Sequence, residues 1–463
     1  MKANDTSIGV KAPLDEGFRP MAIALRVQKE SARTGQGATL AIAWERDGGC
    51  VARYDLALPS KDEDEHVFRL AERVVKFVLW AGGGWRLFLA GPDWLCRRIG
   101  ADYAAGGHRT FDVNFMNRVY GRSVEVVTRR MEEMPGAKDA TLTAGGHLDG
   151  CRLGFDLGAS DYKVSAVNQG EVVFSEELHW TPGTQSDPDY HFNKLNEGLK
   201  LAAGHLPRVD AIGGSTAGLV VANRIMVASL FRSVPEARFG DARNIFLRIQ
   251  KEWQVPVEVA NDGDVTALAG ALSMGVNAIL GVALGSSEAG GYIDRGGHLT
   301  GRITELAFAP VDFNPAAAAD EWSGDHGVGA MYFSQQAVNK LAPAAGFCFE
   351  AGMPLPERLK MVQERMKTGD ERTRRLYETI GVYLGYTVPW YREFYDFDSM
   401  MILGRVTSGP GGDVIIATAN EVLRKEFPEW ADRVKVFMPD EKARRVGQSV
   451  AAASLPETGG GAG

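Results

Sequence analysis

A carboxylate stands where one strand is predicted to end and a helix to begin. Val257–Ala260 alternates as a strand does, Asn261-Asp262 follows, and Val265–Met274 has the spacing of a helix. In that position Asp262 can accept the proton of a substrate hydroxyl while the hydroxyl oxygen attacks phosphorus. The structural alternative is that Asp262 or Asp264 only caps the helix. We assign the cap to Asp264 and the general base to Asp262.

A glycine-rich turn, Asp156–Ser160, lies between two strand-like runs. Gly158 lets the backbone approach a ligand closely, and Ser160 can donate its hydroxyl group to a phosphate. Asp156 can hold a Mg²⁺ ion through water. Taken alone, such a turn is more often only a tight hairpin.

Two further turns of this kind occur later in the chain. Gly285–Gly291 follows the apolar run Ile279–Leu284, and Gly404 and Gly409 precede a helix predicted at 413–425. Backbone N–H groups at such turns can cradle a phosphate. Three turns together favour a nucleotide site. We assign its contacts to Asp156, Gly158, Ser160, Gly285, Ser286, Gly290, Gly291, Gly404 and Gly409.

The elements that must position these residues begin after a loop-like linker at 134–150. Strands are predicted at 153–156, 162–167, 171–174 and 211–214, with a helix near 192–203. The first 150 residues predict strands near 22–27, 38–45, 51–58 and 85–90, a turn at 47–49, and a helix near 67–78 after a capping box at Ser60 and Glu63. Both residues 1–150 and the chain after the linker are thus predicted to have three strands, a helix and a further strand, in that order. Residues 1–150 are therefore interpreted as an accessory α/β domain built on a related unit.

The length, net charge and cysteine spacing of the chain disfavour several classes of function. At 463 residues the chain is long enough for two or three domains. The net charge of −8 disfavours nucleic-acid and anionic-membrane partners. We find no apolar run of the roughly 18 residues that span a bilayer and no secretory signal at the N-terminus. Four widely spaced cysteines without a CxxC pair fit a reduced, cytoplasmic protein.

In the order and spacing of these motifs, the segment from about Leu153 to Ser454 resembles the ROK family of sugar kinases and repressors, within the hexokinase–actin–Hsp70 superfamily. The resemblance implies an α/β, actin-like ATPase (ribonuclease H-like) fold of two lobes. Residues 151–262 and a helix near 441–454 would form the small lobe, and residues 263–440 the large lobe. The accessory domain, residues 1–150, would be a degenerate ribonuclease H-like unit.

The resemblance also implies an activity. The protein would be an ATP- and Mg²⁺-dependent phosphotransferase acting on a hydroxyl of a sugar or polyol, with Asp262 as general base. Asn261 and Asp262 match the family's sugar-binding pair, and Glu305 matches the Glu of its Gly-Glu-Ile-Gly-His motif. Homodimers are common in the family, so a homodimer is an expectation here.

The chain departs from the family at several sugar-side positions. The His of the sugar motif is Phe308, and a sugar-contacting Glu is replaced by Ala330. The family's zinc cluster is matched in spacing by residues 321–328, but all of its cysteines are missing. We therefore predict no structural zinc. Asp325 and His326 are candidates to supply the missing sugar contacts.

Glu288 lies within the second glycine-rich turn, where the family has a small or apolar residue. A carboxylate about 5 Å from a phosphate charge would cost roughly 3 kcal/mol at an effective dielectric near 20. Three interpretations stay open. Glu288 belongs to a metal shell, or it points away from the phosphates, or nucleotide binding has been lost.

A second hypothesis is a non-catalytic carbohydrate-sensing or scaffold protein that keeps the fold. Glu288, Phe308 and Ala330 motivate it. A repressor is disfavoured because residues 1–150 show no convincing basic helix-turn-helix. A nucleotide-gated activator is disfavoured because the cysteine spacing offers no cluster site. Residues 455–459 match a sortase recognition sequence, and the tail 455–463 is interpreted as a tag or a coincidence.

Overall fold

The computed structural model describes residues 8–35, 37–143, 145–439 and 441–458, which fold into two compact units. Unit 1 combines the chain up to Ala140 with Val282–Gly290 and Thr300–Met438. Unit 2 combines Thr141–Gly281 with Gly291–Leu299 and the chain from Pro439 onward. The sequence placed the boundary between the lobes after Asp262. The contacts instead keep the helix that follows Asp262 in unit 2 and group the N-terminal residues with unit 1.

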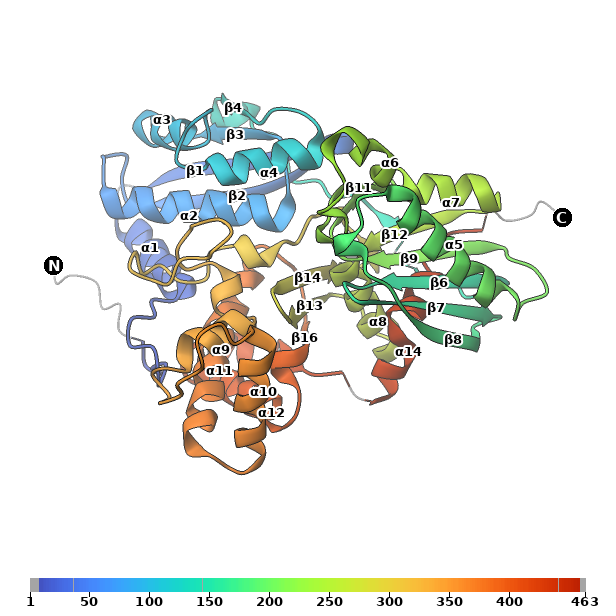
Figure 1. Cartoon of the computed structure of the whole chain (residues 1–463). Helices are drawn as coiled ribbons and strands as arrows, with labels where there is room; N and C mark the ends of the chain where they lie inside the picture. The colour runs from blue at the N-terminus through green and yellow to red at the C-terminus, as the bar shows by residue number, and fades with distance from the viewer. Residues whose placement is uncertain (1–7, 36, 144, 440, 459–463) are drawn as a thin grey trace. The chain divides into compact units, whose positions relative to one another are not determined.

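Unit 2 contains a five-stranded mixed sheet in the order β12-β9-β6-β7-β8 (Figure 1). Its strands are β6 (Cys151–Leu157), β7 (Asp161–Asn168), β8 (Glu171–His179), β9 (Ala211–Thr216) and β12 (Val257–Asn261). β6, β7 and β8 are antiparallel neighbours, whereas β9 runs parallel to β6 and β12 runs parallel to β9. The predicted strands of this half are confirmed.

Helices pack on both faces of this sheet. Apolar side chains of α5 (Pro188–Ala203) and α7 (Ile245–Trp253) share a core with Leu153, Phe155 and Leu157 of β6. The other face carries α8 (Asp262–Met274) and α14 (Glu441–Ala453). A Cβ on Gly154 would lie 1.7 Å from the carbonyl oxygen of Ser449. One on Gly213 would lie 1.7 Å from that of Ala452, so glycine is required where α14 crosses β6 and β9.

The N-terminal part of unit 1 is an α/β layer with the sheet order β2-β1-β3-β4. Its elements are α1 (Met21–Thr34), β1 (Ala38–Arg46), β2 (Cys50–Leu58), α2 (Glu65–Gly82), β3 (Arg86–Ala90), α3 (Asp93–Asp102), α4 (Thr110–Tyr120) and β4 (Glu125–Thr128). The predicted hairpin is confirmed, because β1 and β2 pair around Asp47–Gly49. The capping box predicted at Ser60 and Glu63 is wrong, because the N-cap of α2 is Asp64, four residues after Ser60, and its side chain accepts from the Val67 N–H.

The strand predicted at 22–27 is wrong, because these residues lie in α1. The run Met21–Leu25 is continuously apolar, and such a run does not by itself distinguish a strand from a buried helix. β3 also pairs antiparallel with β1, whereas β9 of unit 2 runs parallel to β6. The N-terminal layer therefore does not repeat the topology of unit 2.

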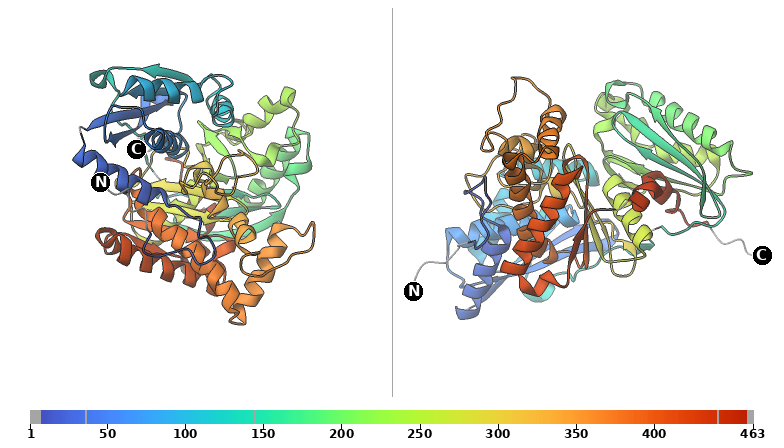
Figure 2. Two further views of the ribbon diagram at one scale, coloured as in Figure 1. Left: turned by 90° about the vertical axis from the view of Figure 1, so that its left-hand side faces the viewer. Right: turned by 90° about the horizontal axis from the view of Figure 1, so that it is seen from below.

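The rest of unit 1 is built on strands in the order β17-β16-β13-β14. The chain passes from unit 2 into unit 1 along β13 (Ile279–Leu284) and returns to unit 2 along β14 (Glu288–Ile293). Helices of the orange to red segment come before β16 (Ser399–Leu403) and between β16 and β17 (Lys435–Phe437) (Figures 1 and 2). These are α9 (Gln335–Leu341), α10 (Leu355–Lys367), α11 (Glu371–Arg392), α12 (Pro410–Glu426) and α13 (Pro428–Ala431). Gly381 and Gly385 let α11 approach α12 closely, since a Cβ on either would come within 3 Å of the α12 backbone.

In unit 2, two short strands, β15 (His298–Leu299) and β5 (Leu142–Thr143), pair with each other. The beginning of the sortase-like sequence packs onto the same unit: Leu455 is buried, and the Arg152 guanidinium donates to the Pro456 carbonyl at 2.7 Å. Its last residue, Gly459, lies outside the described residues. Across the described parts of the chain, no helix is long and apolar enough to cross a membrane.

Candidate functional site

The carboxyl ends of three neighbouring parallel strands bring the predicted catalytic residues to one edge of the unit 2 sheet. Asp156 near the end of β6 pairs in register with Ser215 of β9, and Asn261 at the end of β12 pairs with Thr216. The edge where parallel strands end is where open α/β sheets bind ligands. Asp156, Asn261 and Asp262 therefore lie at the same edge, and the charge of Asp156 acts on Asp262.

Asn261 caps helix α8. Its side-chain oxygen accepts from the Gly263 N–H at 2.7 Å, and its amide nitrogen donates to the Gly218 carbonyl at 2.8 Å. The assignment of the cap to Asp264 is wrong, because an Asn at the strand end already satisfies the first free N–H of the helix. Asn261 thus ties the loop after β9 to the start of α8.

Asp262 is the first residue of α8 and is half-buried. Burial and the nearby negative charge of Asp156 raise the pKa of Asp262 to about 7. Gln448 of α14 donates to the Asp262 carbonyl oxygen at 3.1 Å and to the Thr266 hydroxyl, which fixes the first turn of the helix. A carboxylate with a pKa near neutrality is well matched to taking a proton from a hydroxyl group.

Asp264 faces β14 from the same turn. Its carboxylate accepts weakly from the Tyr292 N–H at 3.4 Å, and burial raises its pKa to about 7. A Cβ on Gly291 would lie 2.0 Å from the Gly263 carbonyl oxygen. Gly291 therefore has a packing reason to be glycine, independent of any phosphate.

The first glycine-rich turn of unit 2 is held by local hydrogen bonds. The Gly158 carbonyl accepts from the Trp180 indole at 2.8 Å, and the Gly158 N–H donates to the Asp161 carbonyl at 3.0 Å. The exposed Ser160 hydroxyl donates to the Asp161 carboxylate at 2.7 Å. Burial raises the pKa of Asp156. Asp156 thus offers a half-buried carboxylate beside an exposed turn, a donor that suits a Mg²⁺ ion bound through water.

The other two glycine-rich turns meet in unit 1. Gly404 has φ of 103°, and a Cβ there would lie 2.6 Å from the Leu284 carbonyl oxygen, next to Gly285. Gly285 donates its N–H to the Ser287 carbonyl at 3.0 Å, and Ser286 is exposed at the tip. Gly409 is the N-cap of α12, with φ of 75°. Gly290 packs against Thr304, so its small size also serves the fold.

Glu288 points into the core of unit 1. Its side chain is 2% exposed, and the Tyr391 hydroxyl donates to one carboxyl oxygen at 3.1 Å. The other oxygen has no hydrogen-bond partner among the described residues. Burial raises the pKa of Glu288 to about 8, and the charge of Glu305 adds to this effect. In this conformation the Glu288 carboxyl group is not exposed at the turn where the sequence suggested a metal ligand.

Glu305 is held by the C-terminal end of α2. The Glu305 N–H donates to the Trp80 carbonyl at 2.9 Å, and the Thr304 N–H donates to the Ala81 carbonyl at 3.2 Å. The Trp80 ring also packs on Phe308, with 4.6 Å between the ring centroids. The N-terminal layer therefore positions the segment 304–308 that was matched to the family's sugar motif.

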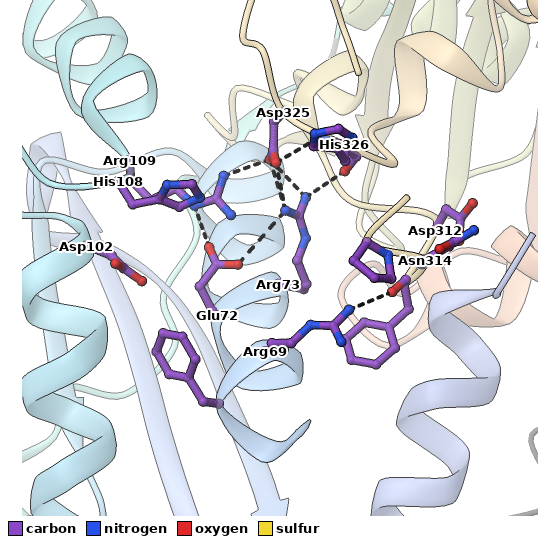
Figure 3. Close-up of a pocket in the computed structure, with 13 residues that line it drawn as sticks. Arg69, Glu72, Arg73, Asp102, His108, Arg109, Asp312, Asn314, Asp325 and His326 are labelled. Atoms are coloured by element: carbon purple, nitrogen blue, oxygen red, sulfur yellow. Dashed lines mark hydrogen bonds and ion pairs between the residues drawn. The ribbon is translucent and has the colours of Figure 1, made fainter. Parts of the chain in front are cut away.

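Asp325 is the centre of a buried ionic cluster, of which Figure 3 draws Asp325, Arg73, Arg109 and Glu72. Its carboxylate contacts Arg73 at 2.9 Å, Lys76 at 2.5 Å and Arg109 at 2.7 Å. Glu72 and Asp112 supply two more carboxylates to the same cations. The three cations together lower the pKa of Asp325 far below its usual range, despite its burial. Asp325 is thus occupied by protein partners, and it anchors the loop 320–328 to α2 and to Arg109.

His326 is exposed, and its Nδ1 atom lies 2.6 Å from the Ala317 carbonyl oxygen. Within the described ranges, no three His, Cys, Asp or Glu side chains come together as a metal site. The loop 320–328 is held in this chain by the Asp325 cluster.

Sequence reasoning missed the cations of this cluster. Arg73 and Lys76 lie in the helix α2 among buried apolar residues, and Arg109 is 4% exposed. Charged residues within an otherwise apolar helix face are a usable signal, because buried charges are normally paired. The partner, Asp325, is more than 200 positions away and could not be named from the sequence.

No family model and no curated protein matches this chain. Solved structures do match. A ROK family transcriptional regulator, a homolog of the E. coli MLC protein, is 19% identical, with 67% of this chain and 78% of that chain covered and a TM-score of 0.54. A ROK hexokinase from Thermus thermophilus is 18% identical, with 66% of this chain and 97% of that chain covered and a TM-score of 0.52. At these identities the likeness is one of fold, and the chain therefore has the α/β fold of the ROK proteins over about two thirds of its length.

Proposed function

We propose that the chain is a ROK-type sugar kinase, which transfers the terminal phosphoryl group of ATP to a hydroxyl of a sugar or polyol. The observation that carries the proposal is the meeting of Asp156, Asn261 and Asp262 at the carboxyl ends of β6, β9 and β12. A hexokinase is among the structures that share the fold. The site chemistry and the fold thus point to the same class of reaction.

In the proposed reaction Asp262 accepts the proton of the acceptor hydroxyl. The hydroxyl oxygen then forms a bond to the terminal phosphorus, and the bond from that phosphorus to the bridging oxygen breaks, so that ADP leaves. A pKa of about 7 lets Asp262 be unprotonated in a large fraction of molecules near neutral pH. Asp156 would hold Mg²⁺ through water, and the ion would neutralise phosphate charge.

The turns around Gly285, Ser286, Gly404 and Gly409 are proposed to bind the nucleotide. Support comes from unit 1, where Gly404 approaches the backbone next to Gly285. Glu288 has no part in metal binding in this proposal, because its carboxyl group is buried against Tyr391. Its burial also removes the phosphate repulsion that would otherwise argue against nucleotide binding.

Glu305 is proposed to contact the acceptor, whereas Asp325 is proposed to anchor its loop rather than bind sugar. The protein would act on a small neutral acceptor, with Mg²⁺ and ATP and without zinc. A homodimer and a cytoplasmic location remain part of the proposal. Asp262→Asn is the direct test: phosphoryl transfer to the sugar found in an acceptor panel should fall at least about 1,000-fold, while Mg-ADP affinity in calorimetry stays unchanged. An unaltered transfer rate in this variant would exclude Asp262 as the base.

The second candidate is a carbohydrate-sensing protein without phosphoryl transfer. Phe308 favours it, because the position that carries His in the family here packs an aromatic ring on Trp80. A ROK transcriptional regulator also shares the fold. Calorimetry separates the two candidates. Sugar binding without any binding of Mg-nucleotide would select the sensor.

A further inference from the structure

A second cavity lies wholly within unit 1, between α2, the turn before Arg109 and the loop that follows Asp312 (Figure 3). Its volume is about 350 Å³, which is at the lower end of the range for small-molecule pockets. None of Asn261, Asp262 and Glu305 lines it. The cavity is therefore separate from the residues proposed for phosphoryl transfer.

Most of the charged groups around this cavity have partners within the protein. Three arginines line it, Arg69, Arg73 and Arg109, together with four carboxylates. Asp325 neutralises Arg73 and Arg109 directly, and Glu72 accepts from Arg109. A phosphate or carboxylate ligand would have to displace Asp325 from these guanidinium groups, so the cavity does not favour an anion.

Asp312, another lining carboxylate, is also satisfied by the protein. It accepts from the Tyr332 hydroxyl at 2.6 Å and from the Arg19 and Asn314 N–H groups at 2.9 and 2.8 Å. It offers no free charge to a cationic ligand. Of the four carboxylates that line the cavity, Glu72, Asp312 and Asp325 thus have partners within the protein.

Both hydrogen-bond donors and acceptors line the wall of the cavity. The Arg73 Nε–H is buried and has no hydrogen-bond partner among the described residues. In Figure 3 the exposed His108 ring lies beside the Arg109 side chain, and the half-buried Asp102 carboxylate lies on the same side of the cavity. Hydroxyl groups can donate to a carboxylate and accept from a guanidinium at the same time. Groups of both kinds therefore suit a ligand with several adjacent hydroxyls.

Apolar surface completes the lining. Phe68 and Phe313 contribute aromatic rings, and the Arg69 guanidinium lies 4.9 Å from the centroid of the Phe313 ring. C–H groups of a pyranose can pack on such surface while its hydroxyls reach the polar wall. We propose that this cavity is a second binding site of the chain, for a neutral mono- or disaccharide.

The test is hydrogen–deuterium exchange of the full chain carrying Asp262→Asn, with glucose, N-acetylglucosamine and maltose as probes and no nucleotide. At least one of these sugars should slow exchange in the segments 66–73 and 312–326. In calorimetry, Arg69→Met and His108→Gln should each weaken its Kd by about tenfold, through loss of one polar contact. Arg97→Met removes the same charge from an exposed residue outside the cavity and should leave Kd unchanged.

Three results would overturn the proposal. The first is that none of the three sugars slows exchange in these segments at millimolar concentrations. The second is protection that persists fully in both Arg69→Met and His108→Gln. The third is protection by glucose 6-phosphate but not by glucose, which would indicate an anion site. Because the readout needs no catalysis, failure of the kinase proposal would not be confused with failure of this one.

Discussion

The main-chain N–H of Glu305 donates a 2.9 Å hydrogen bond to the carbonyl oxygen of Trp80. This bond joins the N-terminal layer to the segment that is proposed to meet the acceptor. The Trp80 side chain strengthens the connection, because its ring packs on Phe308 and its indole N–H donates to Asp112. The N-terminal residues are therefore part of the frame of unit 1 rather than an appendage.

Trp80→Ala should remove this packing and leave a cavity. We expect a loss of about 3–5 kcal/mol in the free energy of unfolding, because a fully buried Trp is truncated. Urea unfolding measures the loss, and hydrogen exchange of residues 303–308 should quicken. Trp80→Phe is the matched control. It keeps an aromatic ring against Phe308, so exchange as fast as in Trp80→Ala would contradict the positioning role.

Asp325→Asn should destabilise the protein strongly. Three buried cations would face two carboxylates in place of three, and breaking a buried ion pair costs about 3–5 kcal/mol. Adding Lys76→Met removes one of the unpaired charges, so the double variant should recover part of the loss. Glu321→Gln, at an exposed position of the same loop, should have little effect. A double variant less stable than Asp325→Asn would contradict the charge-pairing account.

The Asp325 cluster also predicts that the stability of the folded protein depends on pH. The pKa of Asp325 is lowered in the folded protein, so its contribution to stability is complete above the ordinary Asp value and is lost as pH falls below it. The difference in melting temperature between wild type and Asp325→Asn should thus be constant from pH 5 to 7. It should narrow below about pH 4. A difference that is unchanged down to pH 2.5 would argue against an ionic origin.

For Glu288 we expect the opposite pH dependence, a contribution to stability that is lost as pH rises. Its pKa rises from an ordinary value of 4.5 to about 8, so the folded state binds more protons than the unfolded state between these values. Stability contributed by the neutral form therefore declines as pH rises from 4.5 to 8, by at most about 1.4 kcal/mol for each pH unit in this window. Glu288→Gln keeps an acceptor for Tyr391 and removes the titration. Its melting temperature should fall less than that of the wild type between pH 5 and 8, and parallel curves would refute the buried-acid interpretation.

The activity of the proposed kinase should rise with pH on its acid side. Asp262 acts as a base only when it is unprotonated, and its pKa is about 7. The value of kcat/KM should therefore increase about tenfold per pH unit below 7 and level off above it. In protein without Mg²⁺, Asp156→Asn removes the neighbouring charge that raises this pKa, so the titration midpoint of Asp262, followed by NMR, should move to lower pH. A midpoint that stays in place would show that the charge of Asp156 does not raise this pKa.

Gly404→Ala should impair the nucleotide turn. A Cβ there would meet the Leu284 backbone at 2.6 Å, and the residue has a positive φ. Gly352→Ala is the matched control, since Gly352 also has a positive φ but has open space around its Cβ position. Both variants carry backbone strain, about 1–3 kcal/mol for Gly404, whose φ of 103° and ψ of 176° lie in a region essentially restricted to glycine. Calorimetry should find weaker Mg-ADP binding for Gly404→Ala alone, and equal effects would show that the turn is not part of the nucleotide site.

The strand ends and turns that carry Asp156, Asn261 and Asp262 could be predicted from the sequence alone. Asp156 and Asn261 lie at or near the ends of short strands, and Asp262 begins the helix that follows one. Parallel strands in one sheet end at the same edge. Local patterns sufficed, because strand ends and turns are encoded by neighbouring residues. The hairpin at Asp47–Gly49 was predictable for the same reason.

The environments of Glu288 and Asp325 could be learned only from the tertiary structure, because their partners are distant along the chain. Whether Glu288 faces a ligand or the core depends on Tyr391, about 100 positions away, and Asp325 became an anchor only because Arg73, Lys76 and Arg109 surround it. The sequence also could not show that Met21–Leu25 form a helix, because a short apolar run fits either a strand or a buried helix. Charge pairing and core packing act between segments that are remote along the chain, so no local pattern records them.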